Sequence, residues 1–489
     1  MKRSVFTMLF EDGDKGALAF NTRTSALARL DAAAAHVLCA GGEGDNASET
    51  VLEELGQAGF LVPDGADEEA DLANRFLADM NRADFLSLCI APTMACNLRC
   101  VYCYEEHEPV RMSAEVEAAV LRFIERRYAR YRFTSLDVLW YGGEPMLEFG
   151  LVKRLSERMI SWCAERGVAY RARITTNATL IDDAAAAELA RLRVTEAMPT
   201  LDGLAATHDA RRVRTDGSGS FEATRQGIRA LAGAGIDVGV NCNLDWANEE
   251  GYRVLRDELA HGEGCPIYAS HLRNYGGWCA GCGEGNASPR CSATTPATEA
   301  DATAASPDLM TRDAYSAELF KLYAEKSPSA ESLIETLTPR RFFCHGKMAS
   351  YFVIDPEGNV CRCDGFMRDA GHVLFNLLDD DYELDWPEKR TLYEKNTRCR
   401  GCAVMPLCLG DCDWEWSMFH DNCSALKTTI GDYVRLLAAK LEERESGGAN
   451  AENADKGAGQ RHVRTLLPPR DADGARSDAY SAFANDGIM

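Results

Sequence analysis

The chain has 489 residues, and its 76 acidic against 53 basic side chains give a formal net charge of −23 at pH 7. Nucleic acids and anionic membranes are bound through a basic surface, so this charge argues against both as partners. The first residues contain only a short apolar stretch and no signal peptide, and no segment reaches the length of a membrane span. We therefore expect a cytoplasmic protein of two or three domains with a large core.

Residues 1–84 are predicted to form a small N-terminal module. Strand-like pieces at 4–10 and 17–21 precede a helix over 49–59, which has apolar residues at helical spacing and ends at Gly and Pro. This pattern suits a winged-helix-like unit, which could bind a peptide by adding it as a strand to an exposed sheet edge. A plain N-terminal extension that packs on the next domain fits the pattern equally well.

Residues 85–275 alternate apolar runs with amphipathic segments, which predicts six β–α repeats around a parallel sheet. The expected strands are 86–91, 136–141, 172–176, 197–201, 238–242 and 267–271, and the expected helices are 113–130, 151–166, 182–191, 221–234 and 249–260. In such α/β sheets, ligand sites form at the C-terminal ends of the strands. We therefore expect an α/β fold with its functional site at that end of the sheet.

The first of these strands leads into Cys96, Cys100 and Cys103, a CxxxCxxC triplet. Iron–sulfur clusters that only transfer electrons normally have four cysteine ligands. A three-cysteine set therefore indicates a cubane cluster with one iron left open for a ligand. A structural zinc loop and buried thiols are the alternative interpretations.

Polar residues follow the next three strands. The turn Gly142-Gly143-Glu144-Pro145 combines paired glycines, which let backbone approach a ligand closely, with a carboxylate that could accept a bond from a ligand ammonium group. The third strand ends at Asn177, whose amide suits ribose hydroxyls or a carboxylate. The fourth is followed by Arg211 and Arg212, and an arginine at this place could pair with a ligand carboxylate. Each feature alone also fits a plain connector, a strand cap or a solvated side chain.

A second cysteine set lies within residues 313–444 and comprises Cys344, Cys363, Cys399, Cys402, Cys408, Cys412 and Cys423. Seven cysteines do not divide into zinc tetrads, although a zinc-ribbon-like clamp is the structural alternative. Residues 276–312, rich in Ala, Ser, Thr and Gly, are predicted to be a flexible insertion, and the polar residues 445–489 a disordered tail. Four further cysteines in apolar surroundings are expected in the core: Cys39, Cys89, Cys163 and Cys242.

The order of these motifs resembles that of the radical S-adenosylmethionine (radical SAM) superfamily, whose fold is a partial (β/α)6 TIM-like barrel. The resemblance covers residues 85–275 and implies that the cysteine triplet holds a [4Fe–4S] cluster whose open iron binds S-adenosylmethionine. It places Tyr102 near the adenine, the Gly142–Pro145 turn at the methionine amino group, and Asn177 and Arg212 as further contacts. The implied chemistry is reductive cleavage to methionine and a 5′-deoxyadenosyl radical, with a reductant such as flavodoxin or ferredoxin.

The second set resembles the SPASM extension of peptide-modifying radical enzymes, which carries two auxiliary [4Fe–4S] clusters. The resemblance implies that Cys399, Cys402, Cys408 and Cys423 hold one cluster, and that Cys344, Cys363 and Cys412 hold the other with one ligand missing. Cys361 could share a strand face with Cys363, but only Cys363 fits the Gly-x4-Cys spacing from Gly358. One of Cys279, Cys282 and Cys291 could supply the missing ligand; exposed thiols are the alternative.

The run 86–93 leading into Cys96, together with the N-terminal module, resembles thioether-forming peptide maturases. We therefore expect a precursor peptide or protein as substrate, modified through a cysteine thioether crosslink. The alternative enzyme is an anaerobic sulfatase-maturating enzyme, which oxidises Cys or Ser to formylglycine; Asp364 occupies the place of that family's candidate base. A non-catalytic iron–sulfur electron carrier is the third possibility, and the open-site triplet and the Gly142–Pro145 turn argue against it.

Overall fold

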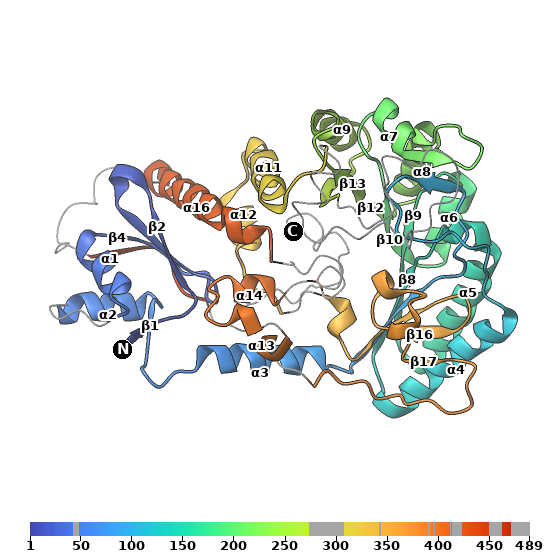
Figure 1. Cartoon of the computed structure of the whole chain (residues 1–489), viewed down its shortest axis with the longest axis horizontal. Helices are drawn as coiled ribbons and strands as arrows, with labels where there is room; N and C mark the ends of the chain where they lie inside the picture. The colour runs from blue at the N-terminus through green and yellow to red at the C-terminus, as the bar shows by residue number, and fades with distance from the viewer. Residues whose placement is uncertain are drawn as a thin grey trace.

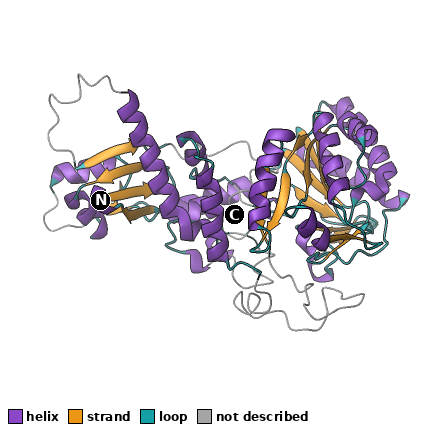
Figure 2. Cartoon of the chain, turned by 90° about the horizontal axis from the view of Figure 1, so that it is seen from above, coloured by secondary structure: helices purple, strands orange, loops and turns teal. Residues whose placement is uncertain are grey.

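The computed structural model describes residues 1–42, 48–272, 308–341, 344–389, 392–395, 397–410, 412, 423–448 and 462–470. An antiparallel sheet lies at one end of the molecule and a mainly parallel sheet at the other, with helices between them (Figures 1 and 2). Within the described ranges, no helix has the length and apolar character needed to cross a bilayer. The insertion predicted at 276–312 lies outside the described residues up to 307.

Six parallel strands form the barrel: β6 (Phe85–Ile90), β8 (Ser135–Trp140), β9 (Ala169–Thr176), β10 (Val194–Pro199), β13 (Val240–Leu244) and β14 (Ile267–His271). The first four pair side by side in chain order, β13 pairs with β14, and one bridge from Thr200 to Asn241 joins the two groups. The connecting helices are α4 (Ala114–Tyr131), α5 (Phe149–Arg166), α6 (Asp183–Arg191), α8 (Phe221–Gly233) and α9 (Glu249–Gly262). These elements confirm the α/β barrel predicted from the apolar pattern.

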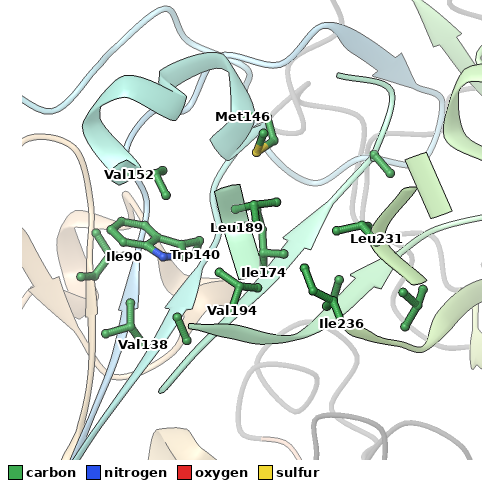
Figure 3. Packing of buried hydrophobic residues seen from close by; sticks show 14 of the residues in the cluster. Ile90, Val138, Trp140, Met146, Val152, Ile174, Leu189, Val194, Leu231 and Ile236 are labelled. Atoms are coloured by element: carbon green, nitrogen blue, oxygen red, sulfur yellow. The ribbon is translucent and has the colours of Figure 1, made fainter. Parts of the chain in front are cut away.

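The barrel core forms where alternate strand residues meet the helices that cover the sheet. Trp140 and Ile174 point from β8 and β9 toward Val152 of α5 and Leu189 of α6, as Figure 3 shows. Alternate residues of the same strands face the barrel interior, because successive strand side chains point to opposite faces. At the start of α4, the Ser113 hydroxyl accepts a bond from the Val116 amide at 3.2 Å, which is the N-cap that the sequence predicts.

The C-terminal region shares its sheet with the barrel. Strand β15 (Tyr351–Ile354) pairs parallel with β6 and continues antiparallel into β16 (Asn359–Cys361) and β17 (Phe375–Asn376). All four residues of β15 are buried, which requires a position inside a sheet covered on both faces. With β12 (Asp237–Val238) at the far edge, the sheet has eight strands. The sequence predicted a separate domain from residue 313, whereas the structure joins it to the barrel.

The remaining C-terminal helices include α11 (Arg312–Glu325), α12 (Ala330–Thr336), α14 (Met405–Cys408) and α16 (Leu426–Gly448). Helices α12 and α16 pack against the N-terminal sheet, since Leu333 and Val434 share a buried cluster with Phe20 and Leu27. This cluster links the module predicted at residues 1–84 to the C-terminal region.

The N-terminal module contains the antiparallel strands β2 (Thr7–Glu11), β3 (Ala17–Asn21) and β4 (Leu27–Leu30) with helices α1 (Ala32–Cys39) and α2 (Glu49–Gln57). A short ladder joins β1 (Lys2–Arg3) to β5 (Leu61–Val62). Helix α3 (Glu68–Met80) runs from this module toward the barrel (Figure 1). Its residue Phe76 is buried in one cluster with Cys89 of β6, so the boundary predicted at residue 84 cuts through a shared core.

The prediction of a disordered tail is wrong for residues 445–448 and 463–467. Helix α16 continues to Gly448, and β18 (Val463–Leu467) pairs antiparallel with β4. The N-terminal sheet therefore has the order β18-β4-β3-β2. Composition over residues 445–489 is polar overall and conceals this short apolar segment, whose Val463, Leu466 and Leu467 are buried against the sheet.

Candidate functional site

A cavity of about 620 Å³ lies at the C-terminal ends of the barrel strands. Its wall contains most of the predicted site residues: Cys96, Cys100, Tyr102, Cys103, Gly142, Gly143, Asn177 and Arg212 from the barrel, and Cys344, Cys363, Asp364, Cys412 and Cys423 from the C-terminal region. Cys399, Cys402 and Cys408 lie elsewhere. The fold thus brings both cysteine sets to one space, although they are far apart in the sequence.

The cysteine triplet is held by a short antiparallel ladder. Strand β7 (Leu98–Cys100) pairs with β11 (Arg212–Arg214), which places Cys100 opposite Arg212. The Val101 amide donates to the Arg211 carbonyl at 2.9 Å, and the Cys103 amide donates to the Cys100 carbonyl at 3.1 Å. Main-chain bonds therefore position the three thiols on the cavity wall.

The two glycines that follow β8 allow close contact with this loop. A Cβ atom on Gly142 would meet the Thr93 carbonyl oxygen at 2.5 Å, and one on Gly143 would meet those of Met94 and Ala95 at 2.3 and 2.4 Å. Gly142 also has a φ of +105°, a conformation that favours glycine. The Gly143 amide donates to the Thr93 carbonyl at 3.1 Å. The glycines thus pack directly against the segment that leads into Cys96.

Neither Glu144 nor Pro145 lines the cavity, and their assignment as ligand contacts stays a prediction. The Glu144 carboxylate is fully buried and accepts bonds from the Thr176 hydroxyl at 2.8 Å, the Met146 amide at 3.0 Å and the Asn177 amide at 2.7 Å. These bonds tie the end of β8 to the end of β9. In this structure the Glu144 carboxylate therefore holds the ends of the two strands together.

Tyr102 and Arg212 share a polar network that also includes Asp202 and Asn243. The Tyr102 hydroxyl donates to the Asp202 carboxylate and accepts from Arg212 Nη1 at 2.8 Å and Asn243 Nδ2 at 3.1 Å. Asp202 is fully buried and also accepts from the Asn243 amide at 2.9 Å. Sequence reasoning assigned no role to Asp202 or Asn243, although Asp202 follows the fourth strand directly.

The remaining polar residues near the triplet support its loop. Asn177 Nδ2 donates to Asn97 Oδ1 at 2.7 Å and lies 3.8 Å from the Cys96 sulfur. Burial, followed by the charge of Arg212, lowers the pKa of His208 to about 3. His208 is therefore neutral, and its Nδ1 accepts from the Asp202 amide at 3.2 Å. These contacts make Asn177 and His208 positioning residues in this structure.

The first auxiliary set, Cys344, Cys363 and Cys412, surrounds one part of the cavity. A Cβ on Gly346 would lie 3.4 Å from the Cys344 sulfur and 3.5 Å from the Cys363 Cβ, so these two cysteines flank the same glycine. Burial raises the pKa of Cys363 most, followed by the charges of Asp364, Cys344 and Cys412, which lie nearby. Cys361 is buried and does not line the cavity, whereas Cys363 does; the choice of Cys363 as the ligand stays a prediction.

The second auxiliary set lines a smaller cavity beside α14 and the start of α16. Its wall includes Cys399, Cys402, Cys408 and Cys423, the four residues that the resemblance assigns to one cluster. Cys423 lines both cavities. The candidates for the missing ligand, Cys279, Cys282 and Cys291, lie outside the described residues.

The other cysteines divide between core and surface. Cys89, Cys163 and Cys242 are buried as expected, whereas Cys39 is exposed at the end of α1. Its apolar neighbours in the sequence face the core from other positions of the helix, so local composition misled this prediction. Cys39 is therefore a useful control residue for cysteine substitutions.

Several cavity residues were missed by sequence reasoning. Glu105 lies two positions after Cys103, its Oε1 is buried without a hydrogen-bond partner, and burial followed by the charge of Asp364 raises its pKa to about 8. Arg173 lines the same cavity from β9 and is 6 % exposed. A buried charged residue inside a strand is an unusual signal that could have marked Arg173.

The described residues contain no group of three or more His, Cys, Asp or Glu side chains that converge on a single metal ion. Each cysteine of a cubane binds a different iron, so its ligands need not converge. Burial raises the pKa of Cys96 to about 11, and cluster binding must therefore displace the thiol protons. The thiol donors suit an iron–sulfur cluster. In addition, Arg212 Nε is buried without a hydrogen-bond partner and could donate to a polar ligand.

Gly143→Ala should weaken the site sharply, because the added methyl group would overlap two backbone carbonyl oxygens beside the cysteine loop. We expect binding of S-adenosylmethionine to weaken by about tenfold or more, which corresponds to about 1.4 kcal/mol. Calorimetric titration of the anaerobically reconstituted variant would measure this loss. Gly150→Ala is the matched control, since its Cβ would meet only the end of the Arg154 side chain at 3.6 Å. Equal affinities in the two variants would contradict the packing role of Gly143.

Comparison with known proteins adds independent evidence. Residues 90–244 match the Radical SAM superfamily. A serine-type anaerobic sulfatase-maturating enzyme from Klebsiella aerogenes is 24% identical over 371 residues, which are 70% of this chain and 82% of that protein. An Fe-coproporphyrin III synthase from Methanosarcina barkeri is 31% identical over 167 residues, but this chain covers only 39% of its length. Likewise, the chain covers 42% of a 29% identical pre-heme d1 synthase from Dinoroseobacter shibae.

Among solved structures, native anSMEcpe with bound AdoMet and Cp18Cys peptide has the same fold, with a TM-score of 0.51 at 16% sequence identity. The alignment covers 75% of this chain and 99% of that one. The superfamily match confirms the recognition made from the motifs and the expectation of S-adenosylmethionine and [4Fe–4S] cofactors; the number of clusters stays a prediction. Residues 90–244 of this chain therefore form a radical SAM domain.

Proposed function

We propose that this radical SAM enzyme modifies a ribosomally synthesised peptide by forming a cysteine thioether crosslink. One observation carries the proposal: a single cavity of about 620 Å³ is lined by the triplet Cys96, Cys100 and Cys103 and by the auxiliary ligands Cys344, Cys363 and Cys412. A substrate in this cavity lies between the two cysteine sets. The volume is in the range of small-molecule sites and suits a peptide side chain beside a cofactor.

The residues of the cavity have separate roles in this proposal. Cys96, Cys100 and Cys103 would hold the cluster that binds S-adenosylmethionine, beside Gly142, Gly143, Tyr102, Asn177 and Arg212. When bound, this cofactor pair supplies a radical that takes one hydrogen atom from the substrate. The surrounding walls exclude water and hold the peptide in reach of the radical.

Asp364 is the proposed proton acceptor. A thioether crosslink removes two hydrogens from the peptide, one from the attacked carbon and one from the donor thiol, and the thiol proton needs a base. Asp364 lies in the cavity wall next to Cys363, and burial raises its pKa, which makes its carboxylate a stronger base. One further electron must leave the peptide. We propose that Cys344, Cys363 and Cys412 would hold an oxidised iron–sulfur cluster that could accept it, since all three line the same cavity.

The second candidate is oxidation of a Cys or Ser to formylglycine. The similarity to a serine-type anaerobic sulfatase-maturating enzyme over 82% of its length favours it, and so does the placement of Asp364. The N-terminal sheet favours the thioether alternative, since such a module could bind a leader peptide as an added strand. A pure electron carrier would need no cavity beside the triplet, so the cavity argues against that alternative.

The product distinguishes the two reactions. We expect a thioether product from short cysteine-containing peptides encoded beside the gene, incubated anaerobically with reconstituted enzyme, reductant and S-adenosylmethionine. This product is two hydrogens lighter and has no free thiol at the donor cysteine, as mass spectrometry and thiol alkylation would show. Formylglycine reacts with a hydrazine, and it lacks the sulfur when it forms from cysteine. A hydrazine-reactive product would establish the second candidate instead.

Asp364→Asn should slow peptide modification by about 100-fold or more, because general bases typically contribute that much. Formation of 5′-deoxyadenosine without peptide should change much less, since it does not need the thiol proton to be removed. Quantifying both products in parallel would measure the two effects. Asp380→Asn, at an exposed acid of the same region, is the matched control. Unchanged peptide modification in the Asp364 variant would remove Asp364 from the mechanism.

A further inference from the structure

The tail strand β18 occupies an edge of the N-terminal sheet. Its residues 463–467 pair antiparallel with β4, and the register shifts between Thr465 and Leu467. Helix α16 covers one face of the sheet, and α1 and α2 cover the other. Because both faces are covered, a further extended segment could join this sheet only at an edge.

Polar contacts at the beginning of β18 resemble a binding site for main chain. The carboxylate of Glu54, on α2, accepts bonds from the backbone amides of both His462 and Val463 at 2.9 Å. Asp31 caps α1, its amide donates to the His462 carbonyl at 3.0 Å, and its carboxylate lies 2.7 Å from the His462 ring. These contacts recognise backbone, so other sequences can make most of them.

Apolar side chains anchor the strand on both faces of the sheet. Val463 is 6 % exposed and joins the cluster of α1 and α2, whereas Leu466 and Leu467 join the cluster of α16. Arg464 and Thr465 are exposed between them. The edge of β4 therefore takes an extended segment with one small apolar residue followed, three and four positions later, by two larger ones.

We propose that β18 is a covalently attached strand that occupies the binding site of the peptide substrate. A leader peptide of the same pattern displaces it from the edge of β4. This inference rests on the proposed function only for the identity of the incoming peptide. Three features of β18 support displacement: it is a single short strand at an edge, its register is interrupted, and its ladder is mostly sequence-independent main-chain bonding.

The covalent attachment of β18 determines how strongly it competes with an external peptide for the edge of β4. A free peptide held by main-chain bonds and a few apolar anchors binds with a Kd of roughly 10 µM. A tethered strand has an effective concentration on the order of 1 mM, so it should weaken binding of an external competitor about 100-fold. Removing or weakening β18 should therefore raise the affinity for external peptide by about that factor.

The experiment uses the synthetic peptide of residues 462–470, fluorescently labelled, and measures its anisotropy with three proteins. A chain that ends at Gly448 should bind it with a Kd of roughly 10 µM, and the full chain about 100-fold more weakly. The full-length Leu466→Asp/Leu467→Asp variant keeps the whole chain and should bind like the truncated one. Thr465→Asp adds a charge at an exposed position and should behave like the unaltered chain.

Two results would overturn the proposal. If the full chain binds the labelled peptide as tightly as the double variant, β18 does not block the edge. If the double variant does not bind it, β18 is a permanent part of the sheet; this variant decides the question even if the truncated chain fails to fold. Thermal unfolding and iron content report on folding in each case.

The substrate peptide gives the final test. The thiol-containing peptide that the enzyme modifies should compete with the labelled tail peptide, and the Leu466→Asp/Leu467→Asp variant should modify it at a lower KM. Modification without competition would show that the substrate docks elsewhere, for example at β2. The anisotropy measurement needs neither cluster nor cofactor, so it tests displacement of β18 even if no peptide is modified. Conversely, a tail peptide that does not bind would overturn the displacement proposal without contradicting the proposed reaction.

Discussion

Replacing Cys96, Cys100 and Cys103 together by alanine should abolish cleavage of S-adenosylmethionine and remove about a third of the iron. The unaltered chain should hold on the order of twelve irons after anaerobic reconstitution, four per cubane. The structure places the three thiols on the wall of the large cavity, next to the glycines that pack against their loop. Iron and sulfide analysis together with quantification of 5′-deoxyadenosine would measure both losses.

Cys39→Ala is the matched control for this substitution. Cys39 is exposed at the end of α1 and lies outside both cysteine-lined cavities, so its loss should change neither iron content nor cleavage. Two outcomes would contradict the assignment: zinc in place of iron in the unaltered protein, or cleavage that survives the triple substitution.

The Cys399→Ala/Cys402→Ala variant should lose about another third of the iron and all peptide modification. These residues line the smaller cavity together with Cys408 and Cys423, between α14 and α16. Ligation in such a site is part of the folding energy, so we expect the midpoint of thermal unfolding to fall by about 5 °C or more. Slow, uncoupled cleavage of S-adenosylmethionine should persist, because the triplet belongs to a different part of the fold.

Cys361→Ala is the control for the second prediction. Its thiol is buried but lies in neither cysteine-lined cavity, so iron content should stay at the level of the unaltered chain. Calorimetry, iron analysis and peptide mass spectrometry would be run on both variants. Full peptide modification by the Cys399/Cys402 variant would show that the four cysteines of the smaller cavity have only a structural role.

The sequence by itself was sufficient for features that depend on local chemistry. The CxxxCxxC spacing of Cys96, Cys100 and Cys103 identified the superfamily, because ligand spacing within one loop does not depend on distant residues. The six barrel strands followed from apolar runs and their helices from helical periodicity, since the strands are largely buried and each helix buries one face. The choice of Cys363 over Cys361 was made from a resemblance and stays a prediction, although only Cys363 lines the cavity.

Tertiary structure alone decided how distant segments share space. Glu144 accepts bonds from Thr176 and Asn177 at the end of the neighbouring strand, and no local sequence pattern reveals these contacts. The strand pairings of β15 with β6 and of β18 with β4 join segments that lie far apart in the sequence. Main-chain hydrogen bonds between strands carry almost no sequence signature, so such pairings, and the common cavity of the two cysteine sets, emerge only once the chain is folded.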